Sequence, residues 1–402
     1  MPAPLSRFWR LAIPIVAAAS AGCHEAVPTG PVEGSPGAMP ALATATGSLA
    51  FVQVTQGGTH TCGVTADNRA YCWGSNSLGE LGDGSQNPSR IPLPVAGDLR
   101  FQSVSAGNGF TCGVKTDGKA YCWGVNFDGT LGNGSTADLS LIPVAVAGNR
   151  RYRQLRAGAA HVCAVTLGDI SFCWGNNQFK QLGAAASVSD RARLPVRVET
   201  GGLTFRRLIP GGSHTCGLTA DGVAYCWGNN NSGQLGNGTT GPTAPLDRVR
   251  GTLMFSQLSA GQDHTCGVAD GKAYCWGANQ EGELGDGTRI NRTRPKAVTG
   301  GLTFKGVSAS NQFSCGITSD DLAYCWGLNG VGQLGLGTTG GSHLVPTRVV
   351  GGHSFSAFGG MISSRHACAV TPDQRAFCWG GNSSGQLGDG TLTNRTRPVA
   401  VN

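Results

Sequence analysis

The chain is poor in charged residues and has no long apolar run. Asp, Glu, Lys and Arg together make up only 13% of its 402 residues, a composition that argues against many long surface helices. No apolar stretch reaches the roughly 18 residues that a membrane-spanning helix requires. The short apolar stretches also lack a sustained 3.6-residue period. These absences argue against a helical protein and against a helical membrane span.

The sequence also lacks a Cys-x-x-Cys pair, although it contains 15 cysteines. Zinc sites built from cysteine commonly need two such close pairs, and redox motifs of the thioredoxin type need one. We therefore expect no metal site, no redox centre and no cofactor. Glycine, by contrast, is abundant at 65 residues, which predicts many turns between short elements.

The N-terminus has the features of an export signal. Arg7 and Arg10 precede the apolar stretch 11–20, and the small-residue sequence Ser-Ala-Gly-Cys ends at Cys23. This pattern resembles a bacterial lipoprotein signal, with residues 1–22 removed and Cys23 lipidated; ordinary secretory cleavage near Ala19 or Ala21 is the alternative. Residues 23–47 are rich in Pro, Gly and Ala and are interpreted as a flexible tether. Either cleavage places the mature chain outside the cytoplasm.

The remaining fourteen cysteines define an internal repeat. They form seven pairs, and Trp-Gly follows the second member of each. The seven tryptophans are 49 to 53 residues apart, so seven copies of a unit of about 50 residues fill residues 48–402. The pairs are Cys62 with Cys72, Cys112 with Cys122, Cys163 with Cys173, Cys216 with Cys226, Cys266 with Cys275, Cys315 with Cys325 and Cys368 with Cys378.

Each copy reads as a four-stranded sheet. In the copy covering 255–298, we expect strands near 255–261, 264–268, 272–277 and 294–298, separated by Gly, Asn and Asp. Seven such sheets predict an all-β, seven-bladed β-propeller that forms a single domain. The chain is cut between the last strand of one copy and the first strand of the next. We therefore expect the terminal strand, 397–402, to complete the sheet of the first copy, which begins at 47–51.

The spacing of each cysteine pair predicts one disulfide within each blade. If Cys216 lies opposite Cys226, Thr219 lies opposite Val223 around a three-residue turn that ends in Gly222. The fifth copy is one residue shorter, yet a two-residue Asp270-Gly271 turn keeps its cysteines opposed. Opposed residues have Cα atoms about 4.5–5.5 Å apart, within the disulfide range. Export permits oxidation.

The repeated segments resemble the regulator of chromosome condensation repeat. The resemblance rests on seven tandem copies of the form His-Thr-Cys-Gly…Ala-Tyr-Cys-Trp-Gly-x-Asn-x-x-Gly-Gln-Leu-Gly, spread over about 355 residues. It implies a seven-bladed propeller that works mainly through loop-mediated protein contacts. The guanine nucleotide exchange known in that family is not carried over, because the loop residues it needs have no match here. The copies depart from the pattern at Lys180, Ala184, Ala185, Phe110 and Phe313.

A histidine lies two residues before the first cysteine in five copies: His60, His161, His214, His264 and His366. A ring of imidazoles around an axis could hold a metal. Phe110 and Phe313 occupy the same position in the other two copies, which favours a structural hydrogen bond or a packing role instead. The tryptophans are interpreted in the same way, as core between blades.

Charge and loop composition give the candidate partner-binding residues. Residues 150–207 contain ten Arg and Lys but only three Asp and Glu, and such a basic sector favours an acidic protein or polymer as partner. We select Arg151, Arg153 and Arg156 from this sector, together with loop residues that differ between copies: Phe127, Asp128, Phe179, Gln280 and Glu281.

The function expected is therefore a monomeric, non-catalytic interaction module, exported and tethered to the cell envelope through Cys23 or else secreted. Its partner would be a protein or an acidic polymer, and no nucleic acid partner is expected. The alternative is an envelope hydrolase or lyase with an active site on one face of the ring. No acid–base pair points to such an enzyme, so no catalytic residue is assigned.

Overall fold

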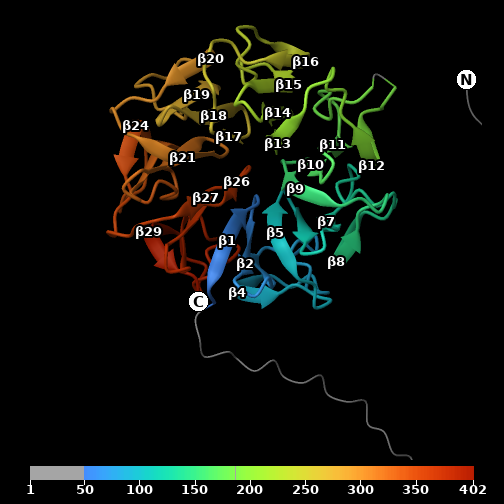
Figure 1. The fold of residues 1–402 in the computed structure, drawn as a ribbon. Helices are drawn as coiled ribbons and strands as arrows, with labels where there is room; N and C mark the ends of the chain where they lie inside the picture. Colours follow the sequence, from blue (N-terminus) through green and yellow to red (C-terminus); the bar gives the residue numbers. More distant parts are fainter. Residues whose placement is uncertain (1–48, 186) are drawn as a thin grey trace, which may run out of the picture. The chain divides into compact units, whose positions relative to one another are not determined.

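The computed structural model describes residues 49–185 and 187–402, which form seven antiparallel sheets around a central axis (Figure 1). The expected signal segment 1–22, the tether 23–47, its Cys23 and residue 48 lie outside these residues. The described part of the chain contains no α-helix, and so no helix that could cross a membrane. The all-β, seven-bladed propeller expected from the repeat is confirmed.

Every blade has four antiparallel strands in chain order, with the first strand nearest the axis and the fourth at the rim (Figure 1). In blades 1 to 6 these strands are consecutive, whereas in blade 7 the short β26 (Gly360–Met361) lies between the first and second strands and pairs with blade 1. In blade 1 these are β1 (Phe51–Gln56), β2 (His60–Thr65), β3 (Ala70–Gly74) and β4 (Ser89–Pro94). The other blades are blade 2 with β5 (Phe101–Ala106), β6 (Phe110–Lys115), β7 (Ala120–Val125) and β8 (Leu139–Ala145); blade 3 with β9 (Tyr152–Ala157), β10 (His161–Thr166), β11 (Ser171–Asn176) and β12 (Arg191–Arg197); blade 4 with β13 (Phe205–Pro210), β14 (His214–Thr219), β15 (Ala224–Asn230) and β16 (Gly241–Arg248); blade 5 with β17 (Gln257–Ala260), β18 (His264–Ala269), β19 (Lys272–Gly277) and β20 (Arg292–Ala297); blade 6 with β21 (Phe304–Ala309), β22 (Phe313–Thr318), β23 (Ala323–Leu328) and β24 (Ser342–Arg348); and blade 7 with β25 (Ala357–Phe358), β27 (His366–Val370), β28 (Ala376–Gly380) and β29 (Arg395–Ala400).

The central hairpins have the register that the cysteine spacing predicts. Cys216 lies opposite Cys226, and the amide of Thr219 donates to the carbonyl of Val223 across the turn at 3.0 Å. Gly222 closes that turn with a φ of 86°, a value that glycine adopts at little cost. In blade 5, Ala269 pairs with Lys272 as expected.

All seven cysteine pairs are at disulfide distance, one pair in each blade, with S–S separations of 2.05 to 2.11 Å. Their Cα atoms are 4.0 to 4.1 Å apart. This separation is slightly shorter than the 4.5–5.5 Å expected for opposed residues. The bonds join the same partners that the spacing predicts: Cys62 with Cys72, Cys112 with Cys122, Cys163 with Cys173, Cys216 with Cys226, Cys266 with Cys275, Cys315 with Cys325 and Cys368 with Cys378.

The core consists of layers between neighbouring blades. The disulfide of one blade packs against the Trp and Phe of the next, as Cys62 and Cys72 do against Trp123 and Phe101. The seven repeat tryptophans are at most 1% exposed. Each Trp ring lies about 6 Å from the Phe or Tyr that starts its own blade, for example 5.7 Å between the centroids of Phe101 and Trp123. The interpretation of the tryptophans as core is confirmed.

The expected exchange of the terminal strand between blades is wrong. Strand β29 pairs with β28 of its own blade, where Cys378 lies opposite Val399, and blade 1 has its own fourth strand, β4. The chain finishes its seventh blade before it ends, so no strand is left over for the first. The ring closes through contacts between complete blades instead, including a short parallel pairing of β1 with β26 (Gly360–Met361).

Candidate interaction surface

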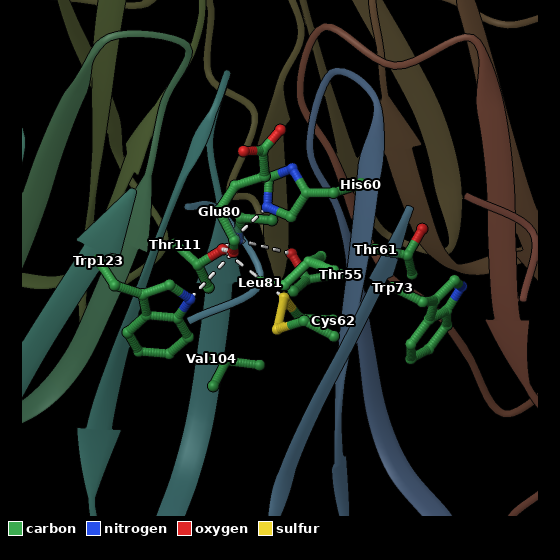
Figure 2. Close-up of a disulfide and its surroundings, with 12 residues drawn as sticks. Thr55, His60, Thr61, Cys62, Trp73, Glu80, Leu81, Val104, Thr111 and Trp123 are labelled. Atoms are coloured by element: carbon green, nitrogen blue, oxygen red, sulfur yellow. Dashed lines mark hydrogen bonds between the residues drawn. A yellow bond between two sulfur atoms is a disulfide. The ribbon is translucent and has the colours of Figure 1, made fainter. Parts of the chain in front are cut away.

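A hydrogen bond from tryptophan to a backbone carbonyl joins each blade to the next. At five junctions a histidine and a hydroxyl extend this bond into a relay. Between blades 1 and 2, the carbonyl oxygen of Glu80 accepts from Trp123 Nε1 at 3.0 Å and from Thr111 Oγ1 at 3.1 Å. Thr111 Oγ1 also lies 2.8 Å from His60 Nε2. Figure 2 shows these residues around the sulfur of Cys62. The same carbonyl therefore anchors both the tryptophan and the threonine of the following blade.

The relay fixes the protonation of the histidines. Because the Thr111 hydroxyl donates its proton to Glu80, His60 Nε2 must be the N–H donor and Nδ1 the bare acceptor. Burial lowers the pKa of His60 to about 4, against an opposing effect of Glu80. Burial likewise lowers the pKa of His214 to about 4 and that of His161, His264 and His366 to about 3. The five imidazoles are neutral at physiological pH.

The two exceptional copies support the structural role of this histidine. Where Phe110 replaces it, the next blade has Val162 in place of Thr; where Phe313 replaces it, the next blade has Ala367. Histidine and hydroxyl are thus lost together, as expected for a hydrogen-bonded pair. Within 49–185 and 187–402, no group of His, Cys, Asp and Glu side chains is arranged to hold a metal. The hydrogen-bonding interpretation of the histidines is confirmed, although the paired substitution is visible in the sequence and was missed there.

The loop after each Trp-Gly is held from inside by its asparagine. In blade 1, Asn76 Oδ1 accepts from the amide of Leu81 at 3.0 Å, and Asn76 Nδ2 donates to Asp83 at 3.1 Å. Asp83 in turn accepts from the amide of Ser85 at 2.9 Å, which is the turn role expected for the Asp-Gly pairs. The repeated residues of this loop are thus used for its own fold.

The loop residues selected from the sequence differ in exposure. The Phe127 side chain is 54% exposed, and its carbonyl accepts from Arg191 Nη1 at 2.8 Å. Phe179 is half-buried and Gln280 is exposed. Two of the five are engaged within the ring: Asp128 accepts from Asn176 Nδ2 at 3.0 Å, and Glu281 lies 3.5 Å from Arg289.

The three selected arginines have different environments. Arg151 is exposed. Arg153 is ion-paired with Asp169, and it donates to the carbonyls of Phe205 and Arg206 in the next blade, so it connects two blades. Arg156 lines a cavity at the ring axis.

Arg151 and Arg153 lie on the face of the ring opposite to the selected loop residues. Asp169, the partner of Arg153, belongs to the hairpin that joins the second and third strands of blade 3. Phe127 belongs to a loop that joins the third and fourth strands. Because strands alternate in direction, these two kinds of connection emerge at opposite ends of a blade. The structure therefore separates Arg151 and Arg153 from the loop residues.

The geometry defines a class of protein: a closed, disulfide-bonded β-propeller whose repeated residues hold the ring and whose loops differ from blade to blade. The sequence agrees with a known family, since residues 21–363 match the model of the RCC1-like domain and residues 362–386 match the regulator of chromosome condensation (RCC1) repeat. The chain belongs to the RCC1-like domain family.

Two solved structures show the same fold. The chain of yeast RCC1 (Prp20), in its complex with Kap60, is similar with a TM-score of 0.73 and 21% identity over 83% of each chain. Human WBSCR16 has a TM-score of 0.74 and 22% identity, over 83% of this chain and 94% of that one. At this level of identity the likeness concerns the fold.

Curated relatives match over shorter stretches. The probable E3 ubiquitin-protein ligase HERC6 of Homo sapiens is 27% identical over 225 residues, which are 54% of this chain and 17% of HERC6. The ultraviolet-B receptor UVR8 of Arabidopsis thaliana is 29% identical over 131 residues, or 32% of this chain and 29% of UVR8. The chain thus spans less than a third of the length of these relatives.

Proposed function

We propose that this protein is an exported, non-catalytic interaction module that presents its loops to a protein partner. Seven buried disulfides support export, since such bonds persist in oxidising compartments. Protein binding is supported by relatives: one solved structure shows yeast RCC1 (Prp20) bound to Kap60, and another is described with binding of Prp20p to Gsp1p and histones. The partner of this chain is not inferred from theirs.

The observation that carries the proposal is an apolar and basic patch where the Phe127 loop of blade 2 packs on β12 of blade 3. Phe127 is 54% exposed and Leu194 of β12 is 51% exposed, and Gly134 of the same loop lies against Leu194. Arg191 donates a hydrogen bond to the Phe127 carbonyl, which holds a positive charge next to this residue. An exposed aromatic flanked by arginine is the composition enriched in the centres of protein interfaces. We call Phe127, Arg191 and Leu194 the Phe127 patch, and we infer that an acidic protein surface binds there.

Cross-linking of the purified mature protein to intact cells, followed by mass spectrometry, would test the patch. We expect a defined partner whose capture falls by about tenfold or more in Phe127→Ala and Arg191→Gln, the loss typical of interface anchors. Ile290→Ala is the matched control, because Ile290 is 60% exposed in the corresponding loop of blade 5. Equal capture by the patch variants and wild type would refute the patch.

The same proposal includes attachment to the cell envelope through a lipid at Cys23, with secretion as its alternative. One acyl group gives only weak membrane binding, so anchoring requires two or more chains. Fractionation of cells that express wild type or Cys23→Ala separates the two cases. Anchoring is supported if the variant moves from the membrane to the soluble fraction, and secretion is supported if both are soluble.

A further inference from the structure

The cavity at the ring axis is lined by arginines and by no carboxylate. Its volume is about 390 Å³, and its lining residues come mainly from the innermost strands of blades 1 to 4. Four of them are Arg153, Arg156, Arg206 and Arg207. All four belong to β9 and β13, which lie side by side at the centre of the ring (Figure 1). Positive charge is thus gathered on one wall of the cavity.

Two of the four arginines connect blades. Arg153 binds Asp169 and the carbonyls of β13. Arg206 donates to the carbonyls of Phe255 and Ser256 at 3.3 and 2.8 Å, in the next blade. These two would be needed for the ring whatever the cavity contains. Arg156 and Arg207 differ, because neither side chain makes a hydrogen bond or an ion pair within the part of the chain that the structure describes.

Arg156 stands where several other blades have a hydroxyl that holds the next blade. In blades 1, 2 and 5 the counterpart accepts a hydrogen bond from the amide of the following blade at 2.9 to 3.2 Å, in the pairs Thr55 with Ala106, Ser105 with Ala157 and Ser259 with Ala309. In blade 4 the corresponding residue is Pro210, which has no amide hydrogen. The structural reason for a hydroxyl is therefore missing at position 156, and an arginine occupies it.

Arg207 likewise replaces a residue with a structural role. In blades 1, 3 and 5 its counterpart is a glutamine whose amide nitrogen donates to a carbonyl of the next blade at 2.7 to 2.8 Å, in the pairs Gln53 with Val104, Gln154 with Leu208 and Gln257 with Val307. In blades 2, 6 and 7 the counterparts are the small residues Ser103, Gly306 and Ala357. Blade 4 has neither the glutamine bond nor a small residue, and it gains a second cation in the same cavity. Packing between blades explains neither arginine.

The two cations are close to each other. Partial loss of hydration among the inner strands lowers the pKa of Arg156, and the neighbouring charge of Arg207 lowers it further. Both side chains remain exposed to solvent inside the cavity. Two like charges on one wall repel each other when no counter-charge is present, and this repulsion raises the free energy of the protein without ligand. An anion between them would relieve that repulsion.

The other lining groups suit oxygen atoms. Thr55 Oγ1 and Ser105 Oγ line the cavity and act as acceptors toward backbone amides, so their hydroxyl hydrogens remain available to donate. Guanidinium groups bind phosphate and carboxylate through paired N–H donors. The cavity volume is at the lower end of the range for small-molecule sites, large enough for an anion with two or three acidic groups.

We propose that the axial cavity binds a small multivalent oxyanion, with its phosphate or carboxylate groups held between Arg156 and Arg207. The site is distinct from the Phe127 patch, and it gives the ring a small-molecule ligand in addition to its partner. Pyrophosphate and citrate are the probes, since they represent the phosphate and carboxylate forms of this chemistry.

Calorimetric titration of the mature protein at low ionic strength tests the site. We expect binding of at least one probe with a stoichiometry of one. Arg156→Ser and Arg207→Gln should weaken it about tenfold or more, as loss of a charge-assisted hydrogen bond does. These substitutions insert the residue types that other blades have at the same places. Arg151→Gln is the control for net charge, and Phe127→Ala separates this site from the patch; both should bind as wild type does.

Thermal unfolding without anion distinguishes a binding role from a structural one. Removal of one of two repelling cations should leave the melting temperature unchanged or raise it, the behaviour of residues kept for binding at a cost in stability. The proposal is overturned if wild type binds neither probe at millimolar concentration, if both variants bind as tightly as wild type, or if both variants melt several degrees lower.

Discussion

At the scale of single residues, the contact between His60 and Thr111 is a pair that the molecule can exchange as a unit. Thr111→Val leaves the His60 Nε2–H buried without an acceptor, and such a group costs about 1–3 kcal/mol. We expect His60→Phe with Thr111→Val to be more stable than the sum of the single changes by about 1 kcal/mol. The combination reproduces Phe110 opposite Val162, which the chain already contains.

Denaturant unfolding of the four proteins in this cycle measures the coupling. The reverse cycle on blades 2 and 3 is its control, with Phe110→His destabilising alone and less so together with Val162→Thr. Additive effects in both cycles would mean that the hydrogen bond between blades contributes nothing beyond packing.

The buried histidines also set a pH dependence. Their folded pKa values of about 3 to 4 lie below the usual 6.5, so the unfolded chain binds more protons as the pH falls. The free energy of unfolding should therefore be highest above about pH 6.5 as far as the histidines are concerned. It should fall toward pH 4 by about 1.4 kcal/mol per pH unit for each histidine that remains neutral in the folded state.

Two carboxyl groups act in the opposite direction, because burial raises the pKa of Glu283 to about 7 and also raises that of Asp263. The five histidines outnumber them, so the melting temperature should still fall between pH 6 and pH 4. In the variant that combines His60→Phe with Thr111→Val, unfolding at these pH values should take up about one proton fewer, so the free energy of unfolding should depend less steeply on pH. A melting temperature that is flat over this range would show that the histidines are not held neutral.

At the scale of the element, each hairpin is closed by a disulfide that packs on the next blade. We expect Cys216→Ala with Cys226→Ala to lower the free energy of unfolding by up to roughly 3 kcal/mol, the value of the loop-entropy model for a loop of this length. Denaturant midpoints of the variant and the wild type give this difference. Removal of a single cysteine, which leaves one free thiol, serves as the comparison, and an unchanged midpoint in the double variant would refute the stabilising role.

The hairpins are also where sequence reasoning was most successful. A fixed distance between cysteines, together with a turn of matching length, determines the register of two adjacent strands, and Cys216 does lie opposite Cys226. The relation between blades was harder to predict. The sequence of the last strand is the same whether that strand pairs within its own blade or completes the sheet of the first blade. The destination of strand β29 was therefore predicted wrongly. The axial position of Arg156 and Arg207 also could not be read from the sequence, because it depends on which end of each strand faces the cavity.

At the scale of the whole molecule, the ring must close between its last blade and its first. The carbonyl of Gln386 in blade 7 accepts from Trp73 Nε1 at 3.0 Å and from Thr61 Oγ1 at 2.8 Å in blade 1. His366 completes this relay with Thr61 at 2.7 Å. Closure therefore uses the same relay as the other junctions that contain a histidine, and we expect that disturbing this junction opens the ring.

Two glycines of the closing loop allow this to be tested. Gly388 and Gly390 have φ values of 72° and 79°, so alanine brings a similar backbone strain of about 1–2 kcal/mol at either position. A Cβ on Gly388 would lie 2.7 Å from Trp73 Nε1, whereas on Gly390 the nearest atom is Asn402 Nδ2 at 3.5 Å. We therefore expect Gly388→Ala to lower the melting temperature by more than Gly390→Ala does. It should also increase the access of a fluorescence quencher to tryptophan, because Trp73 is buried only while blade 7 covers it. Equal melting temperatures and equal quenching in the two variants would mean that this junction is not what holds the ring closed.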